Sequence, residues 1–125
     1  MRIFLSHSTN YDYKKELYYP IIKKFKNTDR EFFLPEEHHI NTKLTIKSCD
    51  IFIAEVSHGP STGMGIEIGW ADAFNKPIIC FYKEGTKISN SIKYLTQNIF
   101  SYNDKNIKLV DLIEEKLSEI IPKQP

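Results

Sequence analysis

Glu67 lies in the stretch of the chain whose residue types are best suited to chemistry, residues 49–82. It follows the loop SHGPSTG, whose proline, glycine and small hydroxyl residues are typical of a connection that approaches a ligand closely. We expect Glu67 in the first turn of a helix that begins near Met64, where the helix dipole and unpaired N–H groups lower its pKa. Those N–H groups and the hydroxyls of Ser61 and Thr62 suit a phosphate or a sugar hydroxyl. The alternative is that Glu67 only satisfies the helix dipole and that the loop is only a connection.

Two apolar segments flank this loop and the helix, and they must position Glu67. DIFIAEV at 50–56 and PIICFY at 77–82 are rich in β-branched and aromatic residues, which predicts fully buried strands. Strands joined by a helix form a βαβ crossover, and ligands of such units bind beyond the carboxyl ends of the strands. The crossover therefore places the loop, at residues 57–65, at a predicted binding site.

The rest of the chain alternates strand and helix patterns. Further strands are expected at 2–6, 31–35 and 99–102, and further helices at 12–26 with an interruption at Pro20, shortly before Cys49, at 88–95 and at 107–121. This order predicts an α/β fold over residues 1–125: a single-domain, doubly wound, flavodoxin- or Rossmann-like five-stranded parallel sheet with helices on both faces.

The composition excludes several kinds of partner. Seventeen basic and sixteen acidic side chains give a net charge of +1, so we expect neither nucleic acid nor a membrane surface as a partner. The start MRIFLSHS lacks the apolar run of a signal peptide, which favours a cytoplasmic protein. Cys49 and Cys80 lie in or beside apolar runs and are expected as buried thiols. No cofactor or metal is expected, because the adjacent His38 and His39 lack a third ligand.

The run GMGIEIGWADAFNKPI at 63–78, taken with CDIFIAEVS at 49–57, resembles the signature of the nucleoside 2-deoxyribosyltransferase family. It is especially similar to the branch of 2'-deoxynucleoside 5'-monophosphate N-glycosidases. The resemblance is dense over 49–82, looser over 1–34 and 83–125, and poor between 35 and 48. It implies a nucleophilic glutamate, here Glu67, that attacks C1' of a deoxyribosyl unit and releases the base. Water (hydrolysis) or a second base (transfer) then accepts the glycosyl group.

The same resemblance implies where a phosphate binds. Ser61 stands six residues before Glu67, where the monophosphate branch has a serine on the phosphate, and Gly63 and Gly65 would let the backbone approach it. The family completes its site across a homodimer interface, and Ser89 stands where a serine reaches the partner's phosphate if two residues are missing from the preceding loop. Ser91 matches if none are missing. The alternative for Ser89 is a helix N-cap.

The first-strand loop and the segment before residue 49 carry the remaining candidates. Ser6, His7, Ser8 and Tyr13 occupy the place where the family binds base and sugar, although a polar loop tip explains them equally well. The family aspartate that shuttles a proton to the leaving base corresponds to Thr42, which cannot act as an acid at neutral pH. Glu36, Glu37, His38 or His39 are candidates to replace it, and the two histidines are otherwise surface residues.

The predicted function is therefore N-glycosidic bond cleavage of a (deoxy)nucleoside 5'-monophosphate or nucleoside. Three alternatives stay open. A non-catalytic nucleotide-binding sensor is favoured by Thr42. A Toll/interleukin-receptor-type NAD glycohydrolase is suggested because IFLSHSTNYDY at 3–13 resembles the opening of those domains. The third is an interaction domain without a ligand.

Overall fold

The sheet of this protein has the predicted parallel topology. The structure is a computed structural model of the 125-residue chain, and it describes residues 1–38, 41–59 and 61–120. Five strands pair in the order β2-β1-β3-β4-β5, every pair parallel. They are β1 (Arg2–His7), β2 (Glu31–Phe33), β3 (Ile51–Glu55), β4 (Ile78–Lys83) and β5 (Ile99–Tyr102). The order reverses between β1 and β3, so the loops after these two strands diverge at the carboxyl edge and leave a crevice there.

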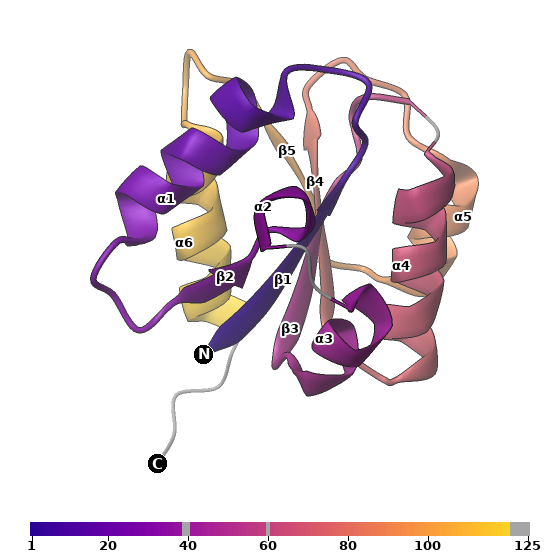
Figure 1. Cartoon of the computed structure of the whole chain (residues 1–125). Helices are drawn as coiled ribbons and strands as arrows, with labels where there is room; N and C mark the ends of the chain where they lie inside the picture. Colours follow the sequence, from indigo (N-terminus) through magenta and orange to yellow (C-terminus); the bar gives the residue numbers. More distant parts are fainter. Residues whose placement is uncertain (39–40, 60, 121–125) are drawn as a thin grey trace.

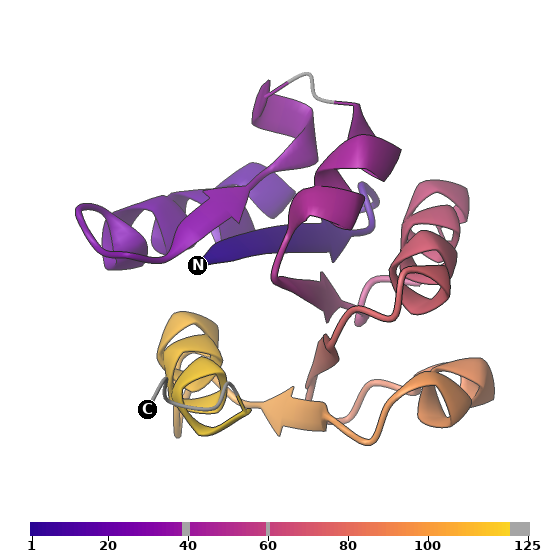
Figure 2. The same ribbon diagram turned by 90° about the horizontal axis from the view of Figure 1, so that it is seen from below.

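Helices cover both faces of the sheet, as Figures 1 and 2 show. They are η1 (Lys14–Tyr18), α1 (Tyr19–Phe25), α2 (Pro35–His38), α3 (Thr42–Ser48), α4 (Thr62–Ala73), α5 (Asn90–Leu95) and α6 (Leu109–Ile120). Helices α1 and α6 pack on one face, and α3, α4 and α5 pack on the other. Among the described residues, no helix combines the length and apolar character needed to cross a membrane.

Strand alternation divides the core into two layers. Leu5, Ile53 and Phe81 point toward α1 and α6, whereas Phe4 and Phe52 point toward α3 and α4 and stack with ring centroids 5.5 Å apart. All five side chains are fully buried, and each contributes about 1.5–3 kcal/mol by leaving water. The alternation fixes which residues at the carboxyl ends of the strands reach each face.

Both cysteines are buried free thiols, as predicted. Burial raises the pKa of Cys49 to about 11 and that of Cys80 to about 12, so neither thiol is a reactive nucleophile.

Pro20 changes the type of the first helix, which agrees with the predicted interruption. Residues Lys14–Tyr18 form a π-helical turn in which the N–H of Tyr19 donates to the carbonyl of Lys14. The α-helical part then begins at Tyr19, with Pro20 in its first turn, where the missing N–H of proline costs no hydrogen bond. The turn buries Tyr18 under the loop that follows β1.

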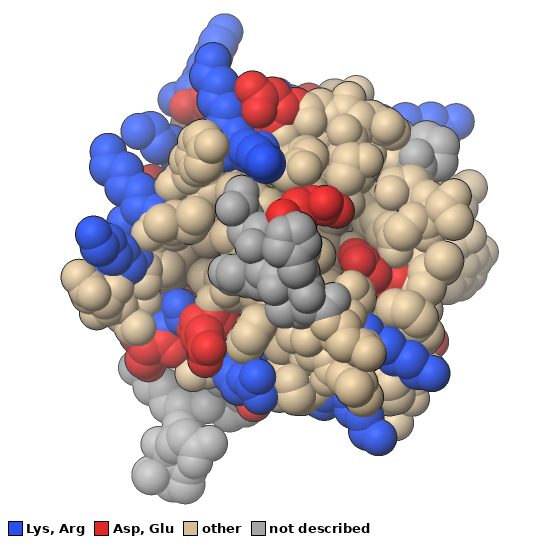
Figure 3. Space-filling view, viewed as in Figure 1, with Lys and Arg blue, Asp and Glu red and all other residues tan. Residues whose placement is uncertain are grey.

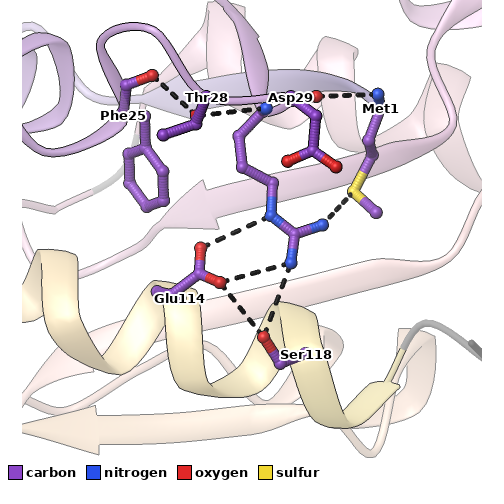
Figure 4. A network of polar contacts seen from close by, with 7 residues as sticks. Met1, Phe25, Thr28, Asp29, Glu114 and Ser118 are labelled. Atoms are coloured by element: carbon purple, nitrogen blue, oxygen red, sulfur yellow. Dashed lines mark hydrogen bonds and ion pairs between the residues drawn. The ribbon is translucent and has the colours of Figure 1, made fainter.

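A polar network ties α6 to the amino ends of β1 and β2 (Figure 4). The Arg30 guanidinium donates to both carboxylate oxygens of Glu114 at 3.3 and 3.4 Å, and the terminal amine of Met1 donates to the carbonyl of Asp29 at 2.9 Å. The network lies at the end of the sheet opposite to the crevice. Its role is therefore structural.

Two segments differ from the prediction in detail. The stretch between β2 and β3 forms two short helices, α2 and α3, where one was expected. The helix α4 begins at Thr62, two residues earlier than expected, because the Ser61 side chain accepts a hydrogen bond from the N–H of Met64 and caps the helix.

Candidate active site

The hydroxyl of Ser6 donates a 2.6 Å hydrogen bond to Oε1 of Glu67 and holds this carboxylate against the end of β1. Ser6 is fully buried and points toward α4, because the strand alternation turns it to that face. Glu67 is the sixth residue of α4 and therefore belongs to its second turn. Both residues were candidates from the sequence, but the sequence did not indicate that they are in contact.

The predicted lowering of the Glu67 pKa was wrong. Its pKa is raised: burial is the largest cause, the negative charge of Glu36 raises it further, and the hydrogen bond from Ser6 opposes both. The prediction failed because Glu67 is largely buried, and because the helix starts at Thr62, which places Glu67 in the second turn and away from the unpaired N–H groups of the first turn.

Glu67 shares a cavity of about 240 Å³ with the start of α4. The cavity is lined by His7, Thr9, Pro35, Glu36, Ser61, Gly63, Met64 and Glu67. It therefore combines two carboxylates, two hydroxyls and a helix N-terminus at the crevice between the loops after β1 and β3. Thr9 and Pro35 were not anticipated. Their only signal in the sequence is that each follows closely on a strand.

The amino end of α4 presents polar groups to this cavity. Ser61 uses its oxygen to cap Met64 at 3.4 Å, which leaves its own hydroxyl proton available to a ligand. Thr62 and Gly63 occupy the first turn, where N–H groups have no carbonyl one turn earlier in the helix. A Cβ added at Gly63 would meet no atom within 4 Å, so this backbone faces open space that a ligand can enter.

Gly65 differs from Gly63. It is exposed, it is not among the residues that line the cavity, and its N–H donates to the Ser61 carbonyl within the helix. Direct backbone contact with a ligand is therefore better placed at Gly63.

His7 lines the cavity with both ring nitrogens already bonded. Nδ1 lies 2.8 Å from the carbonyl oxygen of Ser8, which only accepts, so Nδ1 carries the proton. Nε2 then accepts from the Tyr18 hydroxyl at 2.5 Å. Burial lowers the pKa of His7, which keeps the ring neutral. His7 is thus a fixed wall of the cavity.

The other candidates of the first loop support the loop itself. Ser8 is fully buried and its hydroxyl accepts the N–H of Asn10 at 3.1 Å. The Tyr13 ring packs on His7 and Tyr18, with centroids 4.7 and 5.2 Å away. Neither residue is among those that line the cavity.

The candidates before residue 49 separate in space. Thr42 is the half-buried first residue of α3 and does not line the cavity, whereas Glu36 does. His38 ends α2, but its side chain and that of Glu37 lie outside the described part of the chain, as does the whole of His39. Glu36, the one of these candidates whose side chain the structure describes, lines the same cavity as Glu67.

Ser89 is the N-cap of α5, and its side chain accepts the N–H of Ser91 at 3.2 Å. It is exposed and stands apart from the cavity that holds Glu67 in the same chain. Its predicted N-cap role is therefore present, and any contact with a phosphate requires a second chain.

A second polar cluster was missed by the sequence analysis. Glu55, only 2% exposed, accepts hydrogen bonds from the N–H and hydroxyl of Ser57, at 2.5 and 3.1 Å, and from the Tyr102 hydroxyl. The Ser57 hydroxyl also accepts the N–H of Lys83 at 2.6 Å. Glu55 therefore anchors the loop after β3 to the ends of β4 and β5. The signal was an acidic residue near the end of an otherwise apolar strand.

This cluster borders a cavity of about 280 Å³ on the α1 and α6 side, lined among others by Tyr11, Glu55, His58 and Lys83. It is slightly larger than the cavity of Glu67 but contains neither Glu67 nor the start of α4. The carboxylate of Glu55 is already engaged by several donors, which leaves the Glu67 cavity as the better reaction centre.

This chain is similar in sequence and in fold to known proteins. A sequence model of the nucleoside 2-deoxyribosyltransferase family matches residues 7–115. A protein of Syntrophotalea carbinolica, named as a 2'-deoxynucleoside 5'-phosphate N-hydrolase, is 35% identical over 77 residues, which are 62% of this chain and 47% of that relative. The match thus spans about half the length of this curated relative.

Solved structures share the fold. The CMP N-glycosidase BcmB of Clostridium botulinum superposes with a TM-score of 0.69 and 28% identity, over 91% of this chain and 99% of that one. A 2-deoxyribosyltransferase of Bacillus psychrosaccharolyticus gives a TM-score of 0.62 over 91% of this chain and 95% of that one, and at 15% identity it supports the fold alone.

Proposed function

The chain belongs to the nucleoside 2-deoxyribosyltransferase family, and from this premise we propose that it cleaves the N-glycosidic bond of a (deoxy)nucleoside 5'-monophosphate. The resemblance predicted from residues 49–82 is thereby confirmed. The observation that carries the proposal is the Glu67 carboxylate, held by Ser6 at 2.6 Å in a cavity that also contains the start of α4.

Glu67 is the nucleophile of the proposed reaction. Its carboxylate oxygen bonds to C1' of the sugar while the bond from C1' to the base nitrogen breaks and leaves its electron pair on the base. Water then attacks C1' of the glycosyl ester and regenerates the carboxylate; in a transferase, a second base does so. Burial makes the carboxylate more basic than an ordinary glutamate, which favours attack once it is ionised.

A monophosphate fits the polar groups at the start of α4. The Ser61 hydroxyl and the first-turn N–H groups are donors, and the helix dipole favours an anion there. On the face drawn in Figure 3, acidic and basic side chains are otherwise scattered, with Lys and Arg side chains gathered on the α1 side. The phosphate is therefore held by local donors rather than by an overall field. The CMP N-glycosidase relative also acts on a monophosphate.

A homodimer is part of the proposal. The cavity, at about 240 Å³, falls below the range of about 300–1,000 Å³ common for ligand sites, which fits a site completed by a second chain. On α4, Ile66 is 49% exposed beside Gly65 and Gly69, and a Cβ at Gly69 would meet nothing within 4 Å. This small-residue face allows close approach of another helix. Ser89 of a partner would then reach the phosphate.

Light scattering tests the dimer. Wild-type protein is expected to elute as a dimer, and Ile66→Arg as a monomer with weaker monophosphate binding. A wild-type monomer at high concentration, with full activity, contradicts the shared site.

Free buried thiols fit a reducing compartment, so we place the reaction in the cytoplasm.

Base release tests the reaction. Purified protein is incubated with deoxynucleoside monophosphates, deoxynucleosides and NAD, and free base is measured by chromatography. We expect release from a monophosphate, and none from the Glu67→Ala variant. Release that requires an added acceptor base identifies a transferase. Monophosphate binding without release favours the nucleotide sensor, and nicotinamide release from NAD alone favours the glycohydrolase.

A further inference from the structure

We propose that Glu36 is the general acid and base of this reaction and does the work of the aspartate expected at Thr42. The inference rests on the proposed function of Glu67 as nucleophile. It concerns the half of the reaction in which the leaving base receives a proton and the attacking water loses one.

The fold places Glu36 at the cavity wall. Strand β2 pairs with β1, and α2 begins at Pro35, directly after the buried Leu34. The N–H of Glu36 donates to the Tyr18 hydroxyl at 3.3 Å, and the same hydroxyl donates to His7. Because Tyr18 is fully buried, this contact fixes the backbone of Glu36 beside the end of β1.

The negative charge of Glu36 affects the pKa values of Glu67 and His7, which line the same cavity. Its carboxylate raises the pKa of Glu67 and also opposes the lowering of the His7 pKa. Two carboxylates in one cavity, one as nucleophile and the other as proton carrier, are the arrangement that most retaining glycosidases use.

The other described residues of the cavity cannot carry the proton. His7 is neutral and both its ring nitrogens are bonded. Thr9 and Ser61 offer hydroxyls, which are too weakly acidic at neutral pH. Glu36 carries a carboxyl group, lines the same cavity and is exposed to solvent.

Glu36 gives up one proton and takes up another in each reaction cycle. As the bond from C1' to the base breaks, protonated Glu36 gives its proton to the nitrogen that takes the electron pair, and becomes a carboxylate. That carboxylate then takes a proton from the water that attacks C1' of the glycosyl ester. Glu67 leaves as a carboxylate and Glu36 is protonated again.

The test varies the leaving group. Glu36→Gln is compared with wild type on the nucleoside monophosphate that wild type cleaves best, and on 2-deoxyribose 5-phosphate carrying 4-nitrophenolate at C1', which leaves without a proton. We expect kcat/KM for the nucleotide to fall about 10²- to 10⁴-fold, with a much smaller fall for the aryl probe. Formate is expected to restore part of the nucleotide cleavage by Glu36→Ala. Glu31→Gln, an exposed carboxylate on β2, is the control and should leave both rates unchanged.

The outcomes separate this role from the function on which it rests. Wild-type protein that cleaves neither substrate overturns the proposed function. If wild type is active and Glu36→Gln loses both activities equally, or neither, Glu36 is not the proton carrier. Glu67→Ala should be inactive on both substrates, whereas Glu36→Gln should stay active on the aryl probe. Circular dichroism melting confirms that each variant is folded.

Discussion

If the proposed function holds, the hydrogen bond from Ser6 to Glu67 should set the pH at which activity appears. In the proposed reaction Glu67 must be ionised to attack, and its pKa lies above the ordinary glutamate value of 4.5 because burial outweighs the opposing effect of Ser6. The acid limb of kcat/KM is therefore expected above pH 4.5. Ser6→Ala removes the hydroxyl with little change in shape and should raise the Glu67 pKa further.

The size of the shift follows from the geometry. A hydrogen bond to a charged group contributes about 1.5–3 kcal/mol, and one pH unit corresponds to about 1.36 kcal/mol. The 2.6 Å contact, made by a fully buried serine, is of this charged type. The acid limb of Ser6→Ala should therefore lie about one to two pH units above that of wild type.

The assay is base release from the monophosphate as a function of pH, with kcat/KM measured for wild type and variant. The two profiles should differ most on the acid side and approach each other where Glu67 is ionised in both proteins. Ser8→Ala is the matched control: Ser8 is equally buried at the same strand end, but bonds the N–H of Asn10. If Ser6→Ala does not shift the acid limb, or if Ser8→Ala shifts it as much, the Ser6 hydrogen bond does not set the Glu67 pKa.

For three further substitutions, the direction of the effect on stability, activity or KM is predicted. Since the Glu67 pKa is raised on folding, native stability falls as the pH rises from 4.5 through the raised pKa, so Glu67→Gln should be inactive but at least as stable as wild type in thermal melts at pH 7. Gly63→Ala should stabilise α4 by about 0.5–1 kcal/mol in urea titrations while raising KM for the monophosphate; unchanged KM would place the phosphate elsewhere. Glu55→Ala removes the acceptor of the Ser57 N–H and of the Tyr102 hydroxyl and should lower the free energy of unfolding by about 1–3 kcal/mol per lost hydrogen bond. KM should rise because the loop before Ser61 loses its anchor, and a melt equal to that of wild type would contradict this.

The sheet was predictable because its strands are continuous apolar runs separated by helix-length segments. The parallel direction of the strands then follows from the burial of both faces and from the helix-length connections. Between β2 and β3, the helix α3 was expected shortly before Cys49, whereas α2 was not predicted, since it is short and polar and carries no clear period. Short helices of this kind are stabilised by tertiary contacts rather than by their own sequence.

The position of Glu67 in the chain was predictable, but its environment was not. A helix start two residues earlier moved this carboxylate from the first turn to the second, and burial, together with the charge of Glu36, raises its pKa instead of lowering it. The cap that fixes the start is Ser61, the same residue expected at the phosphate. Capping and ligand binding use different atoms of the side chain, so one residue serves both purposes.

The end of β1 explains how the two carboxylates come to face one cavity. Ser6 and His7 are neighbours on a strand, so their side chains leave on opposite faces. Ser6 turns toward α4 and holds Glu67, while His7 turns toward η1 and holds Tyr18, whose hydroxyl receives the N–H of Glu36. The positions of the proposed nucleophile, Glu67, and of the proposed proton carrier, Glu36, thus both depend on β1. The contact between Tyr18 and Glu36 is made by the backbone N–H of Glu36. Any residue except proline would offer this group at position 36, so the pattern of side chains does not reveal the contact. A one-residue shift of β1 against β3 would exchange the two faces and break both links at once, which makes the register of this strand pair a condition of the proposed chemistry.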